Sequence, residues 1–238
     1  MPYHYDEATI INIIEETDMV RRFFIKMPDT VNFKFNAGQF IMINLPINSK
    51  FTNRSYSIAS APSGDNIFEL CIVLKPDGLG TPFEWRNFKQ GSVIHVSAPI
   101  GKFGLLEPVE TDICFIGTGT GIAPLRSMIG DLYKRQVPHR NIYLVSGNRM
   151  RKDILYKNEF EMLEKENPEF NFIPVLSQAS DDWHGARGYV HSVYEELFAD
   201  KRPAYFYICG WADMLRDTRQ RLEAMGYDKS VIRFESYD

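Results

Sequence analysis

A glycine-rich turn near the middle of the chain constrains the possible folds most strongly. It reads Gly117-Thr118-Gly119-Thr120-Gly121-Ile122-Ala123-Pro124, follows the apolar run Ile113–Ile116, and precedes an amphipathic segment, Leu125–Lys134. A buried strand, a glycine-rich turn and a helix in this order let backbone N–H groups approach a phosphate. Ile122 stands where the dinucleotide fingerprint has its third glycine. The turn therefore predicts a nucleotide-binding half without the standard fingerprint, and a tight turn that binds no ligand is the alternative.

Composition excludes several other classes of protein. The chain has 238 residues and a formal net charge of −4, which gives no reason to expect nucleic acid as a partner. No apolar run approaches the roughly 18 residues that a membrane span needs. The first residues show no secretion signal, so a cytoplasmic location is expected. Three scattered cysteines fit neither a disulfide framework nor a zinc or iron–sulfur site, and no metal site is predicted.

The first 108 residues show the sequence pattern of an antiparallel barrel. Six short runs rich in Ile, Val, Phe and Tyr alternate with turn residues such as Pro28-Asp29 and Gln90-Gly91, and one short helical segment is expected at Pro82–Asn87. The predicted strands are Ala8–Glu15, Arg21–Met27, Gln39–Leu45, Ser55–Ala59, Ile67–Leu74 and Ser92–Ser97. This pattern predicts a six-stranded barrel domain over residues 1–108.

From Thr111 onward, strand-like and helix-like segments alternate, which is typical of a parallel sheet with helices on both faces. We expect a domain over residues 109–238. Its predicted strands are Asp112–Ile116, Asn141–Ser146, Asn171–Val175, Ala204–Cys209 and Ser230–Phe234. Its predicted helices are Ile122–Lys134, Tyr156–Glu166, His191–Ala199 and Asp213–Ala224.

The barrel half contains a motif of its own, Arg54-Ser55-Tyr56-Ser57. Side chains alternate faces along a strand, so Arg54 and Tyr56 project to one side. An arginine fork beside an aromatic ring suits a phosphate that is attached to a flat ring system.

Five motifs together resemble the ferredoxin–NADP reductase superfamily. They are Arg54–Ser57, Gly78-Leu79-Gly80-Thr81, Pro99–Phe103, Gly117–Pro124 and Cys209-Gly210, in that family's order and over nearly the whole chain. The resemblance implies an FAD-binding barrel followed by a nicotinamide-nucleotide domain, with FAD rather than FMN as the flavin. It implies that Tyr56 lies against the isoalloxazine and that Arg54 holds the FAD pyrophosphate. The flavin-binding residues expected on this basis are Arg54, Ser55, Tyr56, Ser57, Ile72, Gly78, Leu79, Gly80 and Thr81.

The last residues place the chain within the superfamily. Relatives of the plant type end in Glu-x-Tyr, and here Glu235-Ser236-Tyr237 is followed by one extra residue, Asp238. The resemblance implies that Tyr237 covers the flavin where nicotinamide reacts, and that Ser57, Cys209 and Glu235 surround the flavin N5. These four are the expected catalytic residues. A buried strand cysteine and a frayed terminal tyrosine are the alternatives for Cys209 and Tyr237.

The sequence contains features that favour NADPH and others that favour NADH. Thr120 and Gly210 are expected to bind the nicotinamide nucleotide, and the resemblance matches Ser177 and Arg187 to groups that bind a 2′-phosphate and Tyr189 to an adenine-stacking tyrosine. Gln178 replaces an expected arginine, and Asp181-Asp182 resemble NADH-using oxygenase reductases and would repel a 2′-phosphate. Arg149, Arg151 and Lys152 could meet such a phosphate. The balance favours NADPH, with NADH as the alternative.

The function implied is an FAD-dependent NAD(P)H reductase in which hydride passes between nicotinamide and flavin, and single electrons pass to or from a separate protein. Ferredoxin, flavodoxin or an oxygenase component is the expected partner. The residues proposed to contact it are Lys50, Lys75, Arg86, Lys89 and Lys102, with scattered surface lysines as the alternative. The other functions considered are an NADH-dependent oxygenase reductase and a non-catalytic electron-transfer subunit.

Overall fold

A computed structural model of the chain describes residues 4–47 and 50–237. The chain forms two compact units. The first comprises Met1–Leu105 with Arg126–Arg135, and the second comprises Leu106–Leu125 with Gln136–Asp238. The chain therefore passes from the second unit to the first inside helix α2, Ile122–Lys134. The boundary expected between Pro108 and Val109 stays a prediction.

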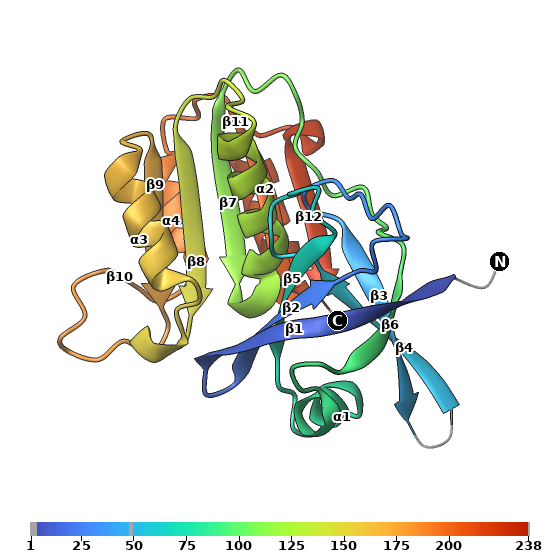
Figure 1. Ribbon diagram of the computed structural model, residues 1–238. Helices are drawn as coiled ribbons and strands as arrows, with labels where there is room; N and C mark the ends of the chain where they lie inside the picture. Colours follow the sequence, from blue (N-terminus) through green and yellow to red (C-terminus); the bar gives the residue numbers. More distant parts are fainter. Residues whose placement is uncertain (1–3, 48–49, 238) are drawn as a thin grey trace. The chain divides into compact units, whose positions relative to one another are not determined.

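The first unit is built on a six-stranded antiparallel sheet in the order β4-β3-β6-β1-β2-β5 (Figure 1). An antiparallel bridge between Ile58, directly after β4, and Leu70 of β5 joins the two edge strands. The N–H of Ala59 also donates to the carbonyl of Glu69 at 2.8 Å. Joining the edges in this way satisfies backbone groups that an open sheet would expose. The strands are β1 (Tyr5–Thr17), β2 (Val20–Lys26), β3 (Phe40–Ile47), β4 (Lys50–Ser57), β5 (Ile67–Val73) and β6 (Val93–Ser97).

Alternating apolar side chains fill the interior of this sheet. In β2, Phe23 and Ile25 are buried while their neighbours are partly exposed, which is the period-two pattern of a strand with one wet face. The single helix described between β5 and β6 is α1, Gly80–Asn87, and its Phe83 and Trp85 pack against the same core. The expected barrel and its short helix are both present.

The second unit is built on a six-stranded parallel sheet in the order β10-β9-β8-β7-β11-β12 (Figure 1). The sequence predicted five of these strands. The sixth, β10, has only two residues, Ala186–Arg187, and pairs with the end of β9. The others are β7 (Asp112–Thr118), β8 (Ile142–Asn148), β9 (Phe170–Leu176), β11 (Ala204–Trp211) and β12 (Ile232–Tyr237). A two-residue strand has no periodicity that a sequence pattern could reveal.

Helices cover both faces of the parallel sheet, as expected. Helix α3 lies on one face, and α4 and α5 lie on the other (Figure 1). Their bounds are α3 (Lys157–Glu166), α4 (Val190–Leu197) and α5 (Ala212–Met225). The central strand β7 is buried from Asp112 to Gly117, which is usual for a parallel strand covered on two sides. From β7 the chain winds outward to β8 and β9, and then returns to place β11 on the other side of β7. The carboxyl ends of β7 and β11 therefore flank the point where the winding reverses, which is where open α/β sheets bind ligands.

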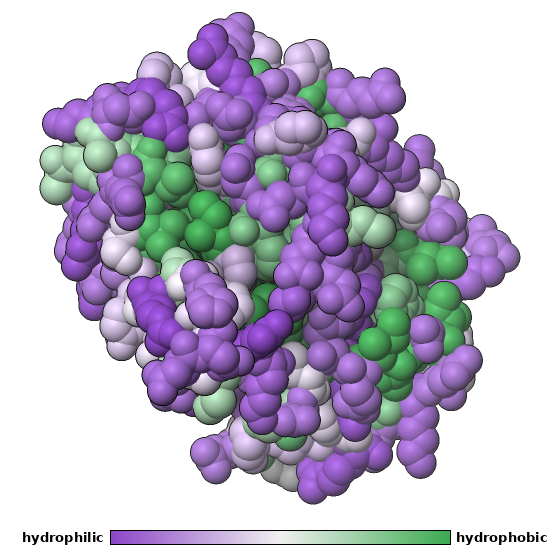
Figure 2. Space-filling view, turned by 90° about the vertical axis from the view of Figure 1, so that its left-hand side faces the viewer, coloured by the Kyte–Doolittle hydropathy of each residue, from purple (hydrophilic) through white to green (hydrophobic). Residues whose placement is uncertain are grey.

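The visible surface is mostly hydrophilic. On the face shown in Figure 2, apolar side chains form separate patches among polar ones. Among the described residues, no helix combines the length and the apolar character that crossing a membrane would require.

Candidate functional site

In the first unit, the chain folds Arg54 against the glycine turn that opens α1. A Cβ placed on Gly80 would lie 2.7 Å from Arg54 Nε and 3.1 Å from Arg54 Cδ, so the missing side chain makes room for the arginine. Arg54 donates from Nη1 to the carbonyl of Asn53 at 2.8 Å. No carboxylate among the described residues lies within ion-pair distance of Arg54. Its guanidinium is therefore a cation with capacity for a bound anion.

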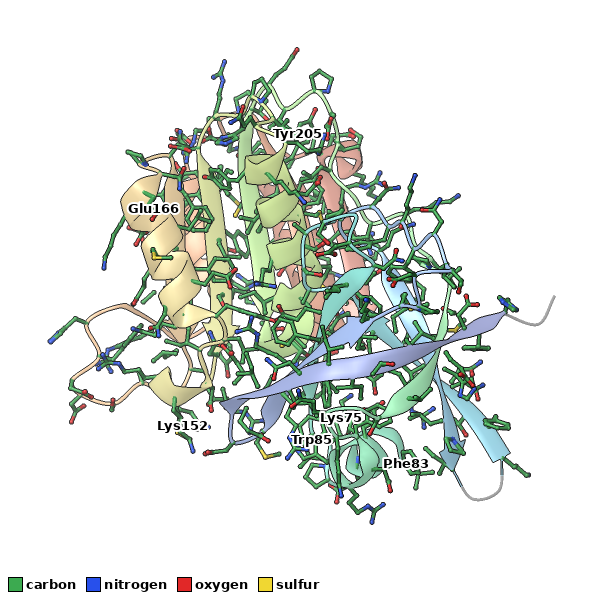
Figure 3. The ribbon with its side chains drawn as sticks, in the orientation of Figure 1. Lys75, Phe83, Trp85, Lys152, Glu166 and Tyr205 are labelled. Atoms are coloured by element: carbon green, nitrogen blue, oxygen red, sulfur yellow. The ribbon has the colours of Figure 1, made fainter. Side chains whose placement is uncertain are left out.

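The turn before α1 presents the start of a helix without a side-chain cap. The N-cap residue Leu79 makes no capping hydrogen bond, and the first turn contains no acidic residue. The first N–H groups of α1 and its positive end are thus suited to an anion. Thr81, expected to bind the pyrophosphate, accepts the N–H of Lys75 at 2.8 Å through its hydroxyl oxygen and shapes the turn. Figure 3 labels Lys75 beside this helix.

The remaining residues of this group lie around the same strand and turn. Gly78 closes the turn with its N–H donating to the carbonyl of Lys75 at 2.9 Å. Leu79 is 60% exposed, Ser55 is exposed, and Ile72 of β5 is buried. Ser57 is buried at the end of β4. Together, Arg54 and the Gly78–Thr81 turn fit a pyrophosphate, because a free cation and an uncapped helix start meet over a glycine.

Sequence reasoning missed one residue of this group, Glu84. It lies on α1, is fully buried, and both its carboxyl oxygens lie close to Tyr56 Oη, at 2.7 and 2.8 Å. Burial raises the pKa of Glu84 to about 7, while the Tyr56 hydrogen bond and the charge of Arg54 lower it in part. Burial and the neighbouring Glu84 raise the pKa of Tyr56 above its usual range, so the phenol keeps its proton. Glu84 belongs to no motif, so no sequence signal could have identified it.

In the second unit, glycines line the crevice at the carboxyl ends of β7 and β11. A Cβ on Gly121 would lie 2.3 Å from the carbonyl oxygen of Cys209, so only glycine fits there. Gly210 has φ +145°, and a Cβ on it would lie 2.2 Å from Thr118 Oγ1. Within the described chain, that threonine hydroxyl oxygen is buried and has no hydrogen-bond partner. An orphaned hydroxyl and a bare glycine backbone beside the start of α2 fit a polar, phosphate-bearing ligand.

Three of the four expected catalytic residues meet at this edge. Parallel pairing of β11 with β12 puts Cys209 opposite Glu235 and Trp211 opposite Tyr237. Burial, followed by the charge of Glu235, raises the pKa of the Cys209 thiol well above its usual range, and a hydrogen bond from Tyr237 lowers it in part. The thiol is therefore neutral and unsuited to act as a thiolate nucleophile. Ser57 belongs to the other unit, and Asp238 lies outside the described residues.

The loop between β9 and α4 contains the residues expected to select the nucleotide. Ser177 is exposed and its N–H donates to the carbonyl of Asn148 at 3.1 Å. Tyr189 is 73% exposed at the N-cap of α4. Arg187 directs its guanidinium into the loop, where Nη2 donates to the carbonyls of Ser180 at 2.9 Å and Trp183 at 2.8 Å.

The acidic residues of this loop also have partners. Asp182 pairs with Arg151 across 3.8 Å and accepts the hydroxyl of Ser180 at 2.5 Å. That hydroxyl lowers the pKa of the Asp182 carboxyl, so it is ionised at neutral pH. A negative charge thus stands on the same loop as the expected phosphate ligands.

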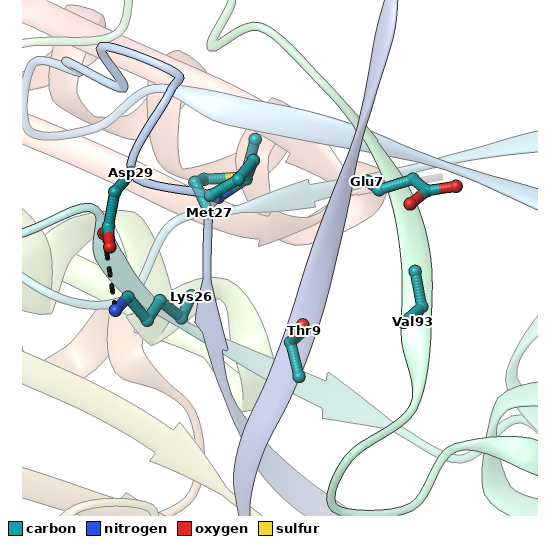
Figure 4. A pocket seen from close by; sticks show the side chains of 7 residues that line it. Glu7, Thr9, Lys26, Met27, Asp29 and Val93 are labelled. Carbon is teal, nitrogen blue, oxygen red and sulfur yellow. Dashed lines mark ion pairs between the residues drawn. The ribbon is translucent and has the colours of Figure 1, made fainter.

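A separate hollow of about 300 Å³ opens on the outside of the barrel (Figure 4). It contains the ion pair between Lys26 and Asp29, 3.3 Å apart. It shares no residue with the expected flavin or nucleotide groups, and its lining is Glu7, Thr9, Lys26, Met27, Pro28, Asp29 and Val93. Over the described part of the chain, no cluster of His, Cys, Asp and Glu could hold a metal ion.

Comparison with known proteins agrees with this geometry. Residues 7–104 match the oxidoreductase FAD-binding domain family, and residues 115–220 match the oxidoreductase NAD-binding domain family. Ferredoxin–NADP reductase B of Sorangium cellulosum is 30% identical over 240 residues, covering 98% of this chain and 97% of that protein. The reductase component of phenol 2-monooxygenase from a Pseudomonas species is 34% identical over 184 residues, which are 76% of this chain and 51% of that protein.

Solved structures agree as well. A ferredoxin NADP⁺ reductase of Neisseria gonorrhoeae, with bound FAD and NADP, superposes with a TM-score of 0.86 at 25% identity and covers 99% of both chains. The resemblance read from five short motifs is therefore confirmed. The chain belongs to the ferredoxin–NADP reductase family and is an FAD-dependent NAD(P)H oxidoreductase.

Proposed function

We propose that this protein takes electrons from a nicotinamide nucleotide at the carboxyl edge of its parallel sheet and delivers them to a separate one-electron carrier. The observation that carries the proposal is the pairing of β11 with β12, which aligns Cys209 with Glu235 and Trp211 with Tyr237 beside the glycine-lined crevice. Bound FAD would supply the exchange between two-electron and one-electron chemistry.

Each group has a distinct role in this proposal. Arg54 and the uncapped start of α1 bind the pyrophosphate of FAD, and Gly80 leaves room for the arginine. Tyr56 and Ser57 position the flavin ring. Thr118, whose hydroxyl has no partner in the described chain, donates to the nucleotide next to Gly210.

The polar groups at the sheet edge hold protons rather than attack the substrate. The neutral Cys209 thiol can donate a weak hydrogen bond, while the carboxyl of Glu235 can hold or release a proton. Tyr237, at the end of β12, would cover the flavin where the nicotinamide reacts, as the resemblance implies.

The contacts of the loop between β9 and α4 favour NADH over NADPH. The sequence favours NADPH through the matches of Ser177, Arg187 and Tyr189 and through the basic residues Arg149, Arg151 and Lys152. Backbone carbonyls already engage Nη2 of the Arg187 guanidinium, which leaves fewer of its N–H donors for a 2′-phosphate. The ionised Asp182 on the same loop would repel the phosphate further. The family accommodates both nucleotides.

The names of the relatives support the choice of electron partner. They include a ferredoxin–NADP reductase and the reductase components of two monooxygenases, one acting on phenol and one on glycine betaine. We propose an acidic carrier such as a ferredoxin, with an oxygenase component as the second candidate. Flavodoxin and a cytoplasmic location stay predictions from the sequence.

Anaerobic titration of the purified yellow protein tests the proposal. NADH should bleach the flavin absorbance at lower concentration than NADPH, and Asp182→Asn should narrow the difference by raising the affinity for NADPH. Failure of both nucleotides to bleach the flavin would instead support the non-catalytic electron-transfer subunit.

A further inference from the structure

A buried carboxyl that the proposed chemistry does not use lies next to the flavin-binding residues. Arg54 and Tyr56 are two apart on β4 and share a face, and Gly80 and Glu84 are four apart on α1 and share a face. The two faces meet in register: Arg54 lies against Gly80, and Tyr56 lies against Glu84. The group proposed to hold the FAD pyrophosphate is thus one helical turn from a buried acid.

The phenol oxygen of Tyr56 lies within hydrogen-bond distance of both carboxyl oxygens of Glu84, and a single hydrogen cannot form a good hydrogen bond to each of them. Tyr56 Oη lies 2.7 Å from one carboxyl oxygen and 2.8 Å from the other. The phenol has one hydrogen and an ionised carboxylate has none. A protonated Glu84 supplies the second hydrogen, so the phenol donates to one oxygen while the acid donates back to the phenol. Each of the two close oxygen–oxygen contacts then has its own hydrogen, which satisfies the fully buried carboxyl of Glu84.

We infer that Glu84 is a positioning residue that is neutral when FAD is bound, fixes the Tyr56 ring through two hydrogen bonds, and couples a proton to FAD binding. This inference rests on the proposed placement of FAD at Arg54 and Tyr56. The proton goes from solvent to a carboxyl oxygen of Glu84 as the diphosphate binds. No bond of the flavin changes in this step.

The charges around Glu84 determine the direction of the coupling. β4 contributes Tyr56 and the Arg54 cation, and β2 contributes Arg21, which donates to the carbonyl of Trp85 at 3.1 Å. β3 also packs against α1 and has no titratable side chain. An ionised Glu84 offsets the Arg54 charge that a diphosphate needs, and it repels the diphosphate itself. A neutral Glu84 leaves the whole cation available.

Burial raises the pKa of Glu84 to about 7, so the coupling between its proton and FAD binding can be measured near neutral pH. Below about pH 7 both the free and the FAD-bound protein have a neutral Glu84, and the affinity for FAD is constant. Above about pH 7, Glu84 of the free protein loses its proton, whereas the bound diphosphate keeps Glu84 of the FAD-bound protein protonated. The dissociation constant for FAD should then rise by up to about tenfold per pH unit until the bound form also ionises.

The experiment dilutes the holoprotein and follows the fluorescence of released FAD from pH 6 to pH 9. Wild type should bind FAD with pH-independent affinity up to about pH 7 and progressively more weakly above it. Calorimetry in two buffers of different ionisation enthalpy should detect proton uptake on FAD binding at pH 8. A wild-type affinity that is flat across this range, or binding without proton uptake, would overturn the inference.

Two substitutions separate coupling from a merely structural role. Glu84→Gln keeps both hydrogen bonds, because its amide donates to the phenol while its oxygen accepts, and it should bind FAD with wild-type affinity at pH 6 and without pH dependence. Glu84→Leu should bind more weakly at pH 6 and also without pH dependence. If Glu84→Gln keeps the wild-type profile, another group titrates and the inference is wrong. If no form binds FAD at any pH, the proposed flavin site itself fails.

Discussion

Gly80 leaves space for the side chain of Arg54 because it has no side chain of its own. A methyl group at this position would lie 2.7 Å from Arg54 Nε, and Arg54 is the end of a flexible side chain that can move away. We therefore expect Gly80→Ala to fold normally but to displace the guanidinium. The dissociation constant for FAD should rise about 10- to 100-fold, because a hydrogen bond to a charged group contributes about 1.5–3 kcal/mol.

Flavin fluorescence on dilution measures this change, and Gly104→Ala is the matched control. A Cβ on Gly104 makes an ordinary contact, 3.6 Å from the carbonyl oxygen of Ala37. That variant should retain FAD like wild type. Equal retention by both variants would remove Arg54 from the flavin site.

Glu84 should also affect stability with pH. Its pKa rises from an ordinary value of 4.5 to about 7 on folding, so between these values the folded protein binds more protons than the unfolded chain. The free energy of unfolding contributed by this group therefore falls as pH rises from about 4.5 to 7, by roughly 3 kcal/mol at most. Below pH 4.5 and above pH 7 the contribution is constant.

Urea unfolding of the FAD-free protein, with wild type and Glu84→Gln compared at each pH, measures this effect. The variant should gain stability relative to wild type between pH 4.5 and 7, and the difference should then stay level. A difference that does not change with pH would mean that Glu84 is solvated in the folded protein.

Single residues show which contacts a sequence pattern can indicate and which it cannot. Cys209 and Glu235 could be matched to the family because their neighbours form a motif, and strand pairing then brings them together. Glu84 has no such motif, and its contact with Tyr56 joins residues that are 28 apart in the sequence. Arg187 as a ligand of a 2′-phosphate stays a prediction, and no local pattern encodes the hydrogen bonds that its guanidinium donates to backbone carbonyls.

At the scale of elements, the turn between β7 and α2 depends on close backbone contact. Gly121 lies so near β11 that a Cβ would be 2.3 Å from the Cys209 carbonyl oxygen, and backbone cannot move aside cheaply. We expect Gly121→Ala to destabilise the second unit by about 1–3 kcal/mol through overpacking. It should also weaken nucleotide binding, because the crevice between β7 and β11 must open.

Thermal unfolding of Gly121→Ala and nucleotide titration are the measurements, with Thr120→Ala as the control for stability. Thr120 is half-buried in the same turn, and its truncation removes atoms rather than adding them. If Gly121→Ala is as stable as wild type, the turn can accept a methyl group at this position and the expected overpacking does not occur.

Elements are predictable where apolar residues alternate or form a continuous run, and unpredictable where neither pattern is present. The strand expected at Ser55–Ala59 runs from Lys50 to Ser57 in the structure, because the first residues of β4 are mostly polar or exposed and show no apolar alternation. The long apolar strands of the parallel sheet were found, since burial on both faces leaves continuous apolar runs. Strand β10 was missed because two residues cannot show a period.

For the whole molecule, the distribution of charge matters more than its sum. The net charge is −4, yet α1 and its flanking turns expose Lys75, Arg86 and Lys89. A local patch of charge steers an incoming partner of opposite charge, whatever the net charge of the protein. An acidic one-electron carrier would therefore be guided to the α1 side of the first unit, near the turn proposed to bind FAD.

Charge reversal tests this steering. Arg86→Glu should lower the second-order rate constant for reduction of an acidic ferredoxin about 3- to 10-fold at low salt, because electrostatic complementarity acts mainly on association. The deficit should shrink as added salt shortens the Debye length to a few ångströms. Lys165→Glu changes the net charge by the same amount on an exposed position of α3, in the other unit. Stopped-flow kinetics of both variants should be measured across a salt series. If only Arg86→Glu lowers the second-order rate constant, the carrier docks at α1. If both variants lower it equally, the carrier responds only to the net charge.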